Sequence, residues 1–163
     1  MKKVALIIIL VCTVGLLGLN AQSAYSLEFN KETKSLVRHM LVYKHPSWVA
    51  KVVTKESKEF YFVSPKSMFE FYFDPQKWAD TKVDDTNTLK EIVVTDYKTH
   101  KAINAKGAFY VYGSNKTSPS GDDLPAFASY DDANEFAQHN NGKRIFSFKE
   151  VKKALIELLN GDI

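Results

Sequence analysis

Cysteine is almost absent from this 163-residue chain, which contains only Cys12. Cys12 lies inside an apolar amino-terminal run and follows Val11, whereas a lipid-attachment cysteine requires a small residue before it. Lipidation is therefore not expected. If the apolar run is removed on export, the mature chain has no thiol for a disulfide, for nucleophilic catalysis or for a metal site.

A strong excess of charge is also missing. The chain has 22 basic and 19 acidic residues, a formal net charge of +3, and its lysines are scattered among acidic residues. This pattern argues against a nucleic-acid partner. No Gly-x-Ser-x-Gly elbow, phosphate loop or His-Glu-x-x-His helix is present, so we expect no enzyme activity. The pairs Asp84-Asp85 and Asp122-Asp123 lack calcium-loop spacing and are interpreted as parts of solvated loops.

The amino terminus has the three-part layout of a signal peptide. Lys2 and Lys3 precede the apolar run 4–19, and small residues follow it, with cleavage expected after Ser23 or Ser26. The run is shorter than the roughly 20 residues that span a bilayer, so no stable membrane span is expected after cleavage. We predict a signal peptide at 1–26, a single domain at 27–163 and an exported, periplasmic protein.

Hydrophobic residues make up 45% of the chain and aromatic residues 13%, which favours a sheet with large side chains packed on it. Ser64-Pro65 predicts a helix start, and Asp74-Pro75 predicts its end. Ser129 predicts the start of a second helix, which Asn141-Gly142 ends. Strands are expected at 47–53, 59–63, 91–97, 107–112 and 143–148, and a final helix at 149–159.

The order of these elements predicts an α+β fold made of two β-β-α-type units. The first two strands form one hairpin, and the strands 91–97 and 107–112 form a second hairpin around residues 98–106. The stretch 113–123 is rich in Ser, Asn, Pro and Gly, and its length is typical of a functional or mobile loop.

Several sequence blocks between Arg38 and Phe148 carry a family resemblance. They are HPSWVA (45–50), YFVSPKSMF (61–69), VTDY (94–97), AFYVYGS (108–114), PAF (125–127) and DANEF (132–136). In this order they resemble the NosL family, exported copper carriers that serve nitrous-oxide reductase. The resemblance implies two β-β-α-type units with antiparallel sheets, related to the organomercurial-lyase fold. It also implies delivery of Cu(I) to an exported copper enzyme or its assembly machinery.

The chain departs from that family at the places where metal ligands are expected. The family block Cys-x-x-Cys-Gly-Met corresponds to residues 35–40, where only Met40 is retained. The later Pro-Met-Gly block corresponds to Pro119-Ser120-Gly121. The resemblance therefore leaves Met40 as the family's remaining methionine ligand in this chain.

Cu(I) is a soft ion that prefers sulfur and accepts imidazole, so Met40 with His39 or His45 is the candidate metal site. Neighbours on an extended segment point to opposite sides, so His39 and Met40 converge only if the chain turns there. The alternative is that Met40 packs on the core under Trp48 while both histidines face solvent. His100 lies in a predicted turn, His139 lies near a predicted helix end, and Met68 lies on a helix face predicted to pack in the core. We therefore do not include them among the candidate ligands.

Two functions remain open. The first is copper handling for an exported reductase, with Met40 holding Cu(I). The second is a metal-free interaction module that keeps the scaffold, with an exposed face or the loop 113–123 docking a partner.

Overall fold

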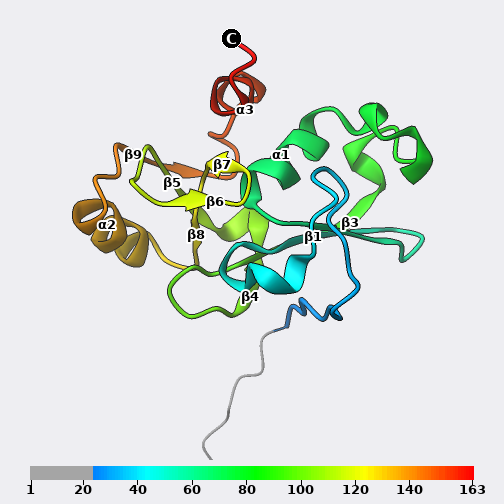
Figure 1. Cartoon of the computed structure of the whole chain (residues 1–163), viewed down its shortest axis with the longest axis horizontal. Helices are drawn as coiled ribbons and strands as arrows, with labels where there is room; N and C mark the ends of the chain where they lie inside the picture. Colours follow the sequence, from blue (N-terminus) through cyan, green and yellow to red (C-terminus); the bar gives the residue numbers. More distant parts are fainter. Residues whose placement is uncertain (1–23) are drawn as a thin grey trace, which may run out of the picture.

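The computed structural model describes residues 24–163, so the predicted leader with Cys12 lies almost entirely outside the described residues. Two antiparallel sheets lie side by side (Figure 1). The first contains, in spatial order, β2 (Glu59–Phe62), β1 (Ala50–Thr54), β3 (Leu89–Thr95) and β4 (Ala102–Asn104). The second contains β8 (Ala126–Phe127), β5 (Phe109–Tyr112) and β9 (Arg144–Ser147). The predicted α+β class with antiparallel sheets is confirmed.

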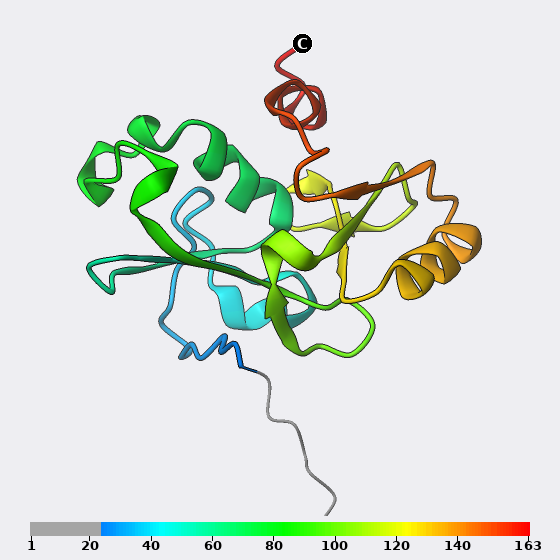
Figure 2. The same ribbon diagram turned by 180° about the vertical axis from the view of Figure 1, so that it is seen from behind.

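Within residues 24–163, three α-helices and several 3-10 turns accompany these strands. The helices are α1 (Pro65–Phe73), α2 (Tyr130–His139) and α3 (Lys153–Asn160). The 3-10 turns are Val42–Lys44, Pro46–Trp48, Pro75–Lys77, Ala79–Thr81, Thr86–Thr88 and Ala105–Gly107. Seen from behind, α2 and the β1–β2 hairpin lie at opposite ends of the molecule, and α3 carries the C-terminus at its edge (Figure 2).

Helix α1 begins and ends where the sequence predicts. Ser64 is extended, and its side-chain oxygen accepts a hydrogen bond of 3.1 Å from the backbone N–H of Ser67. Pro65 occupies the first helical turn, where its missing N–H costs nothing. The helix ends at Phe73, before Asp74-Pro75. Met68 on this helix is fully buried, as core packing predicts.

The predicted second hairpin is wrong, because β3 does not pair with β5. The Asp96 carboxylate accepts hydrogen bonds from the Lys98 N–H and the Thr99 hydroxyl and so turns the chain early. The returning strand is the short β4, which pairs with β3. The turn Ala105–Gly107 then leads the chain into the second sheet, where β5 pairs with β8 and β9. The second β-β-α unit is therefore β5-β8-α2.

Two elements, the first strand and the last helix, begin later in the chain than predicted. The first strand begins at Ala50, because residues 46–48 form a 3-10 turn. The last helix begins at Lys153 rather than Lys149, because the Glu150 carboxylate accepts hydrogen bonds of 2.8 Å from the N–H and the hydroxyl of Ser147 and holds a turn there. The predicted loop 113–123 contains a small hairpin of β6 (Thr117–Ser118) and β7 (Gly121–Asp122).

Helix α2 matches its prediction. The Ser129 hydroxyl oxygen accepts from the backbone N–H of Asp132 at 3.1 Å, and the helix ends at His139. Asn141 then adopts a left-handed φ of 58°. Gly142 follows where a Cβ would lie 2.7 Å from both the Ala137 Cβ and the Val111 Cγ1. Only glycine therefore allows the chain to pass this close to α2 and β5.

One hydrophobic cluster joins the two sheets and α3. It includes Val52 and Phe62 from the first sheet, Tyr110 from the second and Ile156 from α3. A separate small cluster forms around Val42, Val49 and Val63. In residues 24–163, no helix combines the length and the apolar character that crossing a membrane requires.

Candidate functional site

The segment 33–42 forms a tight turn that presents the candidate ligands. Lys34 and Leu41 form an antiparallel bridge, and the Ser35 N–H donates to the Met40 carbonyl at 2.8 Å. The Met40 N–H donates in turn to the Ser35 hydroxyl oxygen at 3.1 Å. His39 adopts a left-handed φ of 55°, so the chain does turn between the two candidate ligands.

Met40 is half-buried and packs on a small apolar cluster of Val42, Val49 and Val63. Trp48 lies outside this cluster, and its ring contacts Tyr97 edge to face at 5.1 Å. Met40 therefore packs on the valine cluster. The alternative interpretation placed it under Trp48, which is not a member of this cluster. Part of the Met40 side chain is therefore buried against this cluster and part stays exposed.

The two candidate imidazoles lie on either side of Met40 in the sequence. His39 is exposed at the turn, and His45 is half-buried between two 3-10 turns. Burial lowers the pKa of His45 below its ordinary value, and the nearby Lys44 charge lowers it further. A neutral ring keeps a nitrogen lone pair free to bind a metal near neutral pH.

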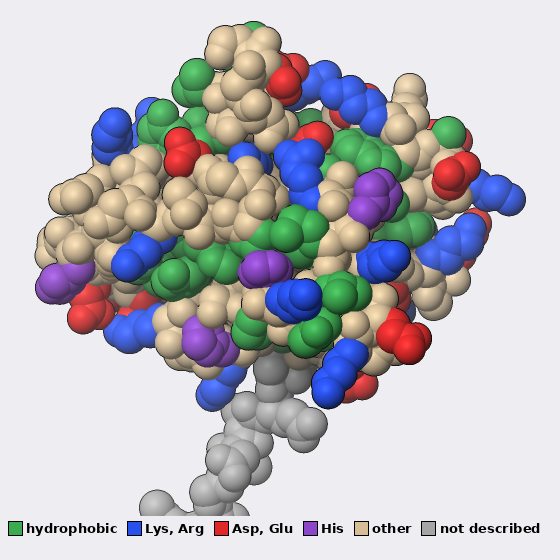
Figure 3. Space-filling model, viewed as in Figure 1, with side chains coloured by type: hydrophobic (Ala, Val, Ile, Leu, Met, Phe, Trp, Pro, Cys, Tyr) green, Lys and Arg blue, Asp and Glu red, His purple; other side chains and the backbone are tan. Residues whose placement is uncertain are grey.

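The histidines do not gather into one site. Figure 3 shows histidine side chains on one face of the molecule as separate patches. His100 is hydrogen-bonded to the Ser47 hydroxyl at 3.1 Å, and His139 Nδ1 donates to the Glu135 carbonyl at 2.7 Å. Across residues 24–163, no three His, Cys, Asp or Glu side chains group so that they could hold a metal ion.

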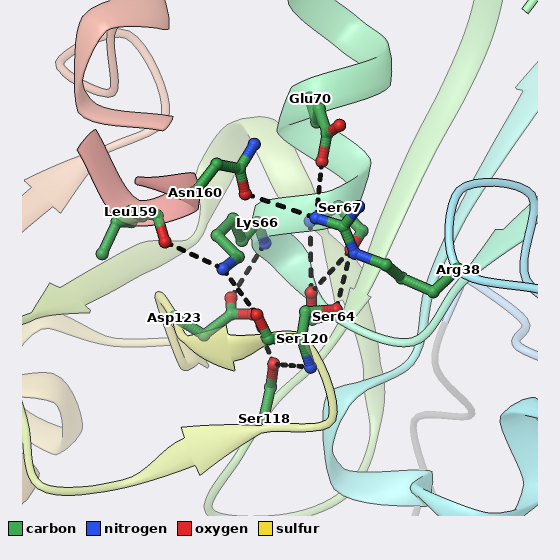
Figure 4. A network of polar contacts seen from close by, with 10 residues as sticks. All are labelled: Arg38, Ser64, Lys66, Ser67, Glu70, Ser118, Ser120, Asp123, Leu159 and Asn160. Atoms are coloured by element: carbon green, nitrogen blue, oxygen red, sulfur yellow. Dashed lines mark hydrogen bonds and ion pairs between the residues drawn. The ribbon is translucent and has the colours of Figure 1, made fainter. Parts of the chain in front are cut away.

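One residue of the block 35–40 and the block 119–121 line the same cleft. Arg38, from the first block, and Ser120, from the second, both line a cleft of about 490 Å³ together with Glu70 and Asn160. Arg38 Nη2 contacts Glu70 Oε2 at 2.9 Å and donates to Asn160 Oδ1 at 3.3 Å. The Ser120 hydroxyl shares a hydrogen bond of 2.9 Å with that of Ser67. Polar side chains thus line this cleft (Figure 4).

Lys66 lies at the base of this cleft with only 2% of its surface exposed. Its Nζ donates to the carbonyl oxygens of Ser120, at 2.6 Å, and Leu159, at 3.2 Å (Figure 4). Burial lowers the pKa of Lys66, and the neighbouring Asp123 carboxylate partly opposes that effect. The ammonium therefore ties α1 both to the β6–β7 hairpin and to the end of α3.

Asp123 corrects the prediction of a solvated Asp122-Asp123 pair, because it is 3% exposed. Its carboxylate accepts hydrogen bonds from the N–H groups of Lys66 and Leu124, at 2.8 and 2.7 Å, and from the Ser118 hydroxyl at 2.6 Å. Burial nevertheless raises the pKa of Asp123 above its ordinary value.

A signal for this acceptor does exist in the sequence. In the first turn of α1, Pro65 has no N–H and the Ser64 side chain satisfies the N–H of Ser67. The Lys66 N–H therefore needs an acceptor from elsewhere in the chain. The sequence therefore predicts that the Lys66 N–H has an acceptor outside the helix, but it does not identify that acceptor as Asp123.

Comparisons with known proteins agree with this architecture. The crystal structure of the copper chaperone NosL from Shewanella denitrificans matches with a TM-score of 0.69 and 24% identity, over 80% of this chain and 97% of that one. The solution structure of apo-NosL from Achromobacter cycloclastes matches with a TM-score of 0.47 and 19% identity, over 66% and 87%. No match was found among curated proteins. The NosL sequence profile covers residues 26–156, which is most of the chain, and the chain therefore belongs to the NosL family.

Proposed function

We propose that this chain is an exported accessory protein that carries Cu(I) in the periplasm and holds the ion through Met40 with the imidazole of His39 or His45. Membership of the NosL family supports this function, as does the name of the Shewanella relative, a copper chaperone. The observation that carries the proposal is the partly exposed Met40 at a turn, flanked in the sequence by His39 and His45, whose imidazoles have no hydrogen-bond partner among the described residues.

The chemistry of these donors suits a carrier. A thioether and a neutral imidazole are ligands that Cu(I) accepts, and neither has to lose a proton when the ion binds near neutral pH. A site with few ligands also leaves the ion open to attack by a ligand of the receiving protein. The proposed receiver is an exported copper enzyme, nitrous-oxide reductase, or its assembly machinery.

A competition titration of the purified mature chain against a chromogenic Cu(I) chelator tests the proposal. We expect one ion per chain. The variant Met40→Leu keeps the apolar packing and removes the sulfur, so its affinity should fall by at least about tenfold, because even indirect changes at metal sites cost about 10–100-fold. Met68→Leu, at a fully buried methionine, is the matched control and should bind like the wild type.

Two outcomes would reject the carrier. Either the wild-type chain fails to compete with a chelator of micromolar affinity, or Met40→Leu binds Cu(I) as tightly as Met68→Leu. The variants His39→Gln and His45→Gln, tested separately, then identify the imidazole that assists, and His139→Gln serves as the histidine control. Delivery is tested by adding the loaded protein to copper-free nitrous-oxide reductase and following the return of enzyme activity.

A second function, a metal-free interaction module, is favoured by the polar cleft. Where the family has its second methionine block, the Ser120 hydroxyl is bonded to Ser67 and the Ser120 carbonyl accepts from Lys66. No buried side-chain nitrogen or oxygen in the described residues lacks a hydrogen-bond partner, so no buried side-chain atom beneath the cleft needs an ion as its partner. In this case the chain would bind the assembly machinery with equal affinity in the presence and absence of a strong Cu(I) chelator.

A further inference from the structure

Residues 24–30, which we call the N-terminal strap, are the first described residues and form no helix or strand. Their burial alternates along the chain. Tyr25, Leu27 and Phe29 are half-buried, whereas the residues between them are exposed. A period of two is typical of an extended segment that lies with one face on the protein. In Figure 1 these residues (blue) lie at the end of the molecule opposite α3.

The inner face of the strap packs on the same small cluster as Met40. Leu27 and Phe29 contact the cluster of Val42, Val49 and Val63, as Met40 and Tyr61 do. The rings of Phe29 and Tyr61 meet edge to face, with centroids 6.4 Å apart. The strap and the candidate copper ligand therefore share one apolar patch, and the strap shields part of it from water.

The strap is held by side-chain contacts. The Tyr61 hydroxyl donates to the Glu28 carbonyl, and Asn104 Nδ2 donates to the Tyr25 hydroxyl at 3.0 Å. No backbone-to-backbone hydrogen bond joins residues 26–29 to another described residue. The middle of the strap, residues 26–29, therefore opens at a lower cost than a strand paired within a sheet.

We propose that the strap is a removable partial cover beside Met40, which limits access to the thioether when closed and eases entry or release of the soft ion when it lifts. The identity of that ion rests on the proposed function. The cover itself rests on the shared valine cluster and on the weak attachment of the strap. Cleavage after either expected position, Ser23 or Ser26, leaves Leu27 and Phe29 in the mature chain.

Oxidation of Met40 by hydrogen peroxide measures the cover without copper. The sulfur takes one oxygen atom from the peroxide, water leaves, and mass spectrometry follows the sulfoxide in each peptide. In the double variant Leu27→Ala, Phe29→Ala, Met40 should oxidise at least about threefold faster, because the rate follows exposure of the sulfur. Met68 is fully buried and reports whether the whole fold has opened. Glu28→Ala, on the outer face, is the control and should leave the rate unchanged.

Tyr61→Phe provides a milder second variant, because it removes the hydroxyl that holds Glu28 and keeps every apolar contact. Met40 should again oxidise faster while Met68 does not. If Met40 reacts at the wild-type rate in both variants, the strap is not a cover. The chelator should also remove Cu(I) from both variants faster than from the wild type.

The two proposals can fail separately. Faster oxidation of Met40 in a chain that binds no Cu(I) would reject the copper carrier and leave the cover standing. Unchanged oxidation in a chain that binds Cu(I) through Met40 would reject the cover and leave the carrier standing.

Discussion

The Asp123 carboxylate accepts a hydrogen bond of 2.8 Å from the Lys66 backbone N–H, although the two residues lie 57 positions apart in the chain. This contact fixes the β6–β7 hairpin against the first turn of α1, where the helix dipole favours an acidic group. It also holds Ser120 in the cleft that Arg38 lines. The shape of that cleft therefore depends on a buried aspartate that lies outside both residues 35–40 and residues 119–121.

Replacing Asp123 by Ala should destabilise the protein. Two backbone N–H groups and the Ser118 hydroxyl would lose their acceptor, so the free energy of unfolding should fall by about 2–4 kcal/mol. Asp122→Ala changes the exposed neighbour and should stay within about 0.5 kcal/mol of the wild type. Urea unfolding of the two variants checks this, and equal losses would contradict it.

The raised pKa of Asp123 predicts a specific pH dependence of stability. The folded state holds the Asp123 proton more tightly than the unfolded state, whose aspartate has a pKa of about 3.9. The contribution of Asp123 to stability should therefore decrease as the pH rises from about 4 through the raised pKa. The free energy of unfolding of the wild type minus that of Asp123→Asn, measured from about pH 4 to 8, should fall. A difference that rises with pH would mean that the hydrogen bonds to the carboxylate lower the Asp123 pKa more than burial raises it.

Lys44 contributes to the low pKa of His45, so Lys44→Gln should raise that pKa toward its ordinary value without reaching it, since burial is the larger cause. NMR titration of the imidazole protons measures the shift. In the wild type, Cu(I) binding that uses His45 should weaken only as the pH falls through its lowered pKa, because a proton and the ion compete for one lone pair. An unchanged His45 titration in Lys44→Gln would remove the electrostatic part of this explanation.

Gly142→Ala should destabilise the protein by about 1–3 kcal/mol, because the added Cβ would lie 2.7 Å from both Ala137 and Val111. Gly107→Ala is the matched control, since nothing lies within 4 Å of the added atom there. Thermal unfolding separates the two variants. Similar melting temperatures for both would show that α2 and β5 can move apart without cost.

The helices and the first hairpin were predictable because local signals determine them. Ser64 and Ser129 cap helices by hydrogen bonds to residues three positions ahead, and such contacts are visible in a single sequence. The pairing of β5 was not predictable in this way. The turn at Asp96 makes β4, rather than β5, the pairing partner of β3. Strand β5 pairs instead with β8 and β9, which lie later in the chain.

The candidate site shows the same division. The turn at His39, next to Met40, involves only neighbouring residues. In contrast, nothing in residues 35–40 indicates that Arg38 lies in a cleft with Ser120. From the sequence alone, Lys66 would be expected at the surface. It is buried because the β6–β7 turn and the end of α3 pack against it. Its environment is therefore a property of the assembled fold.

The position of the strap has a consequence for the order of assembly. Leu27 and Phe29 precede the valines that they cover, the last of which is Val63. A ribosome makes the amino end first, so the strap cannot settle until β2 and the start of α1 have been synthesised and have packed. The strap is thus seated after the cluster that follows it in the chain, and if it covers Met40 as proposed, each newly made molecule passes through an interval in which Met40 is uncovered.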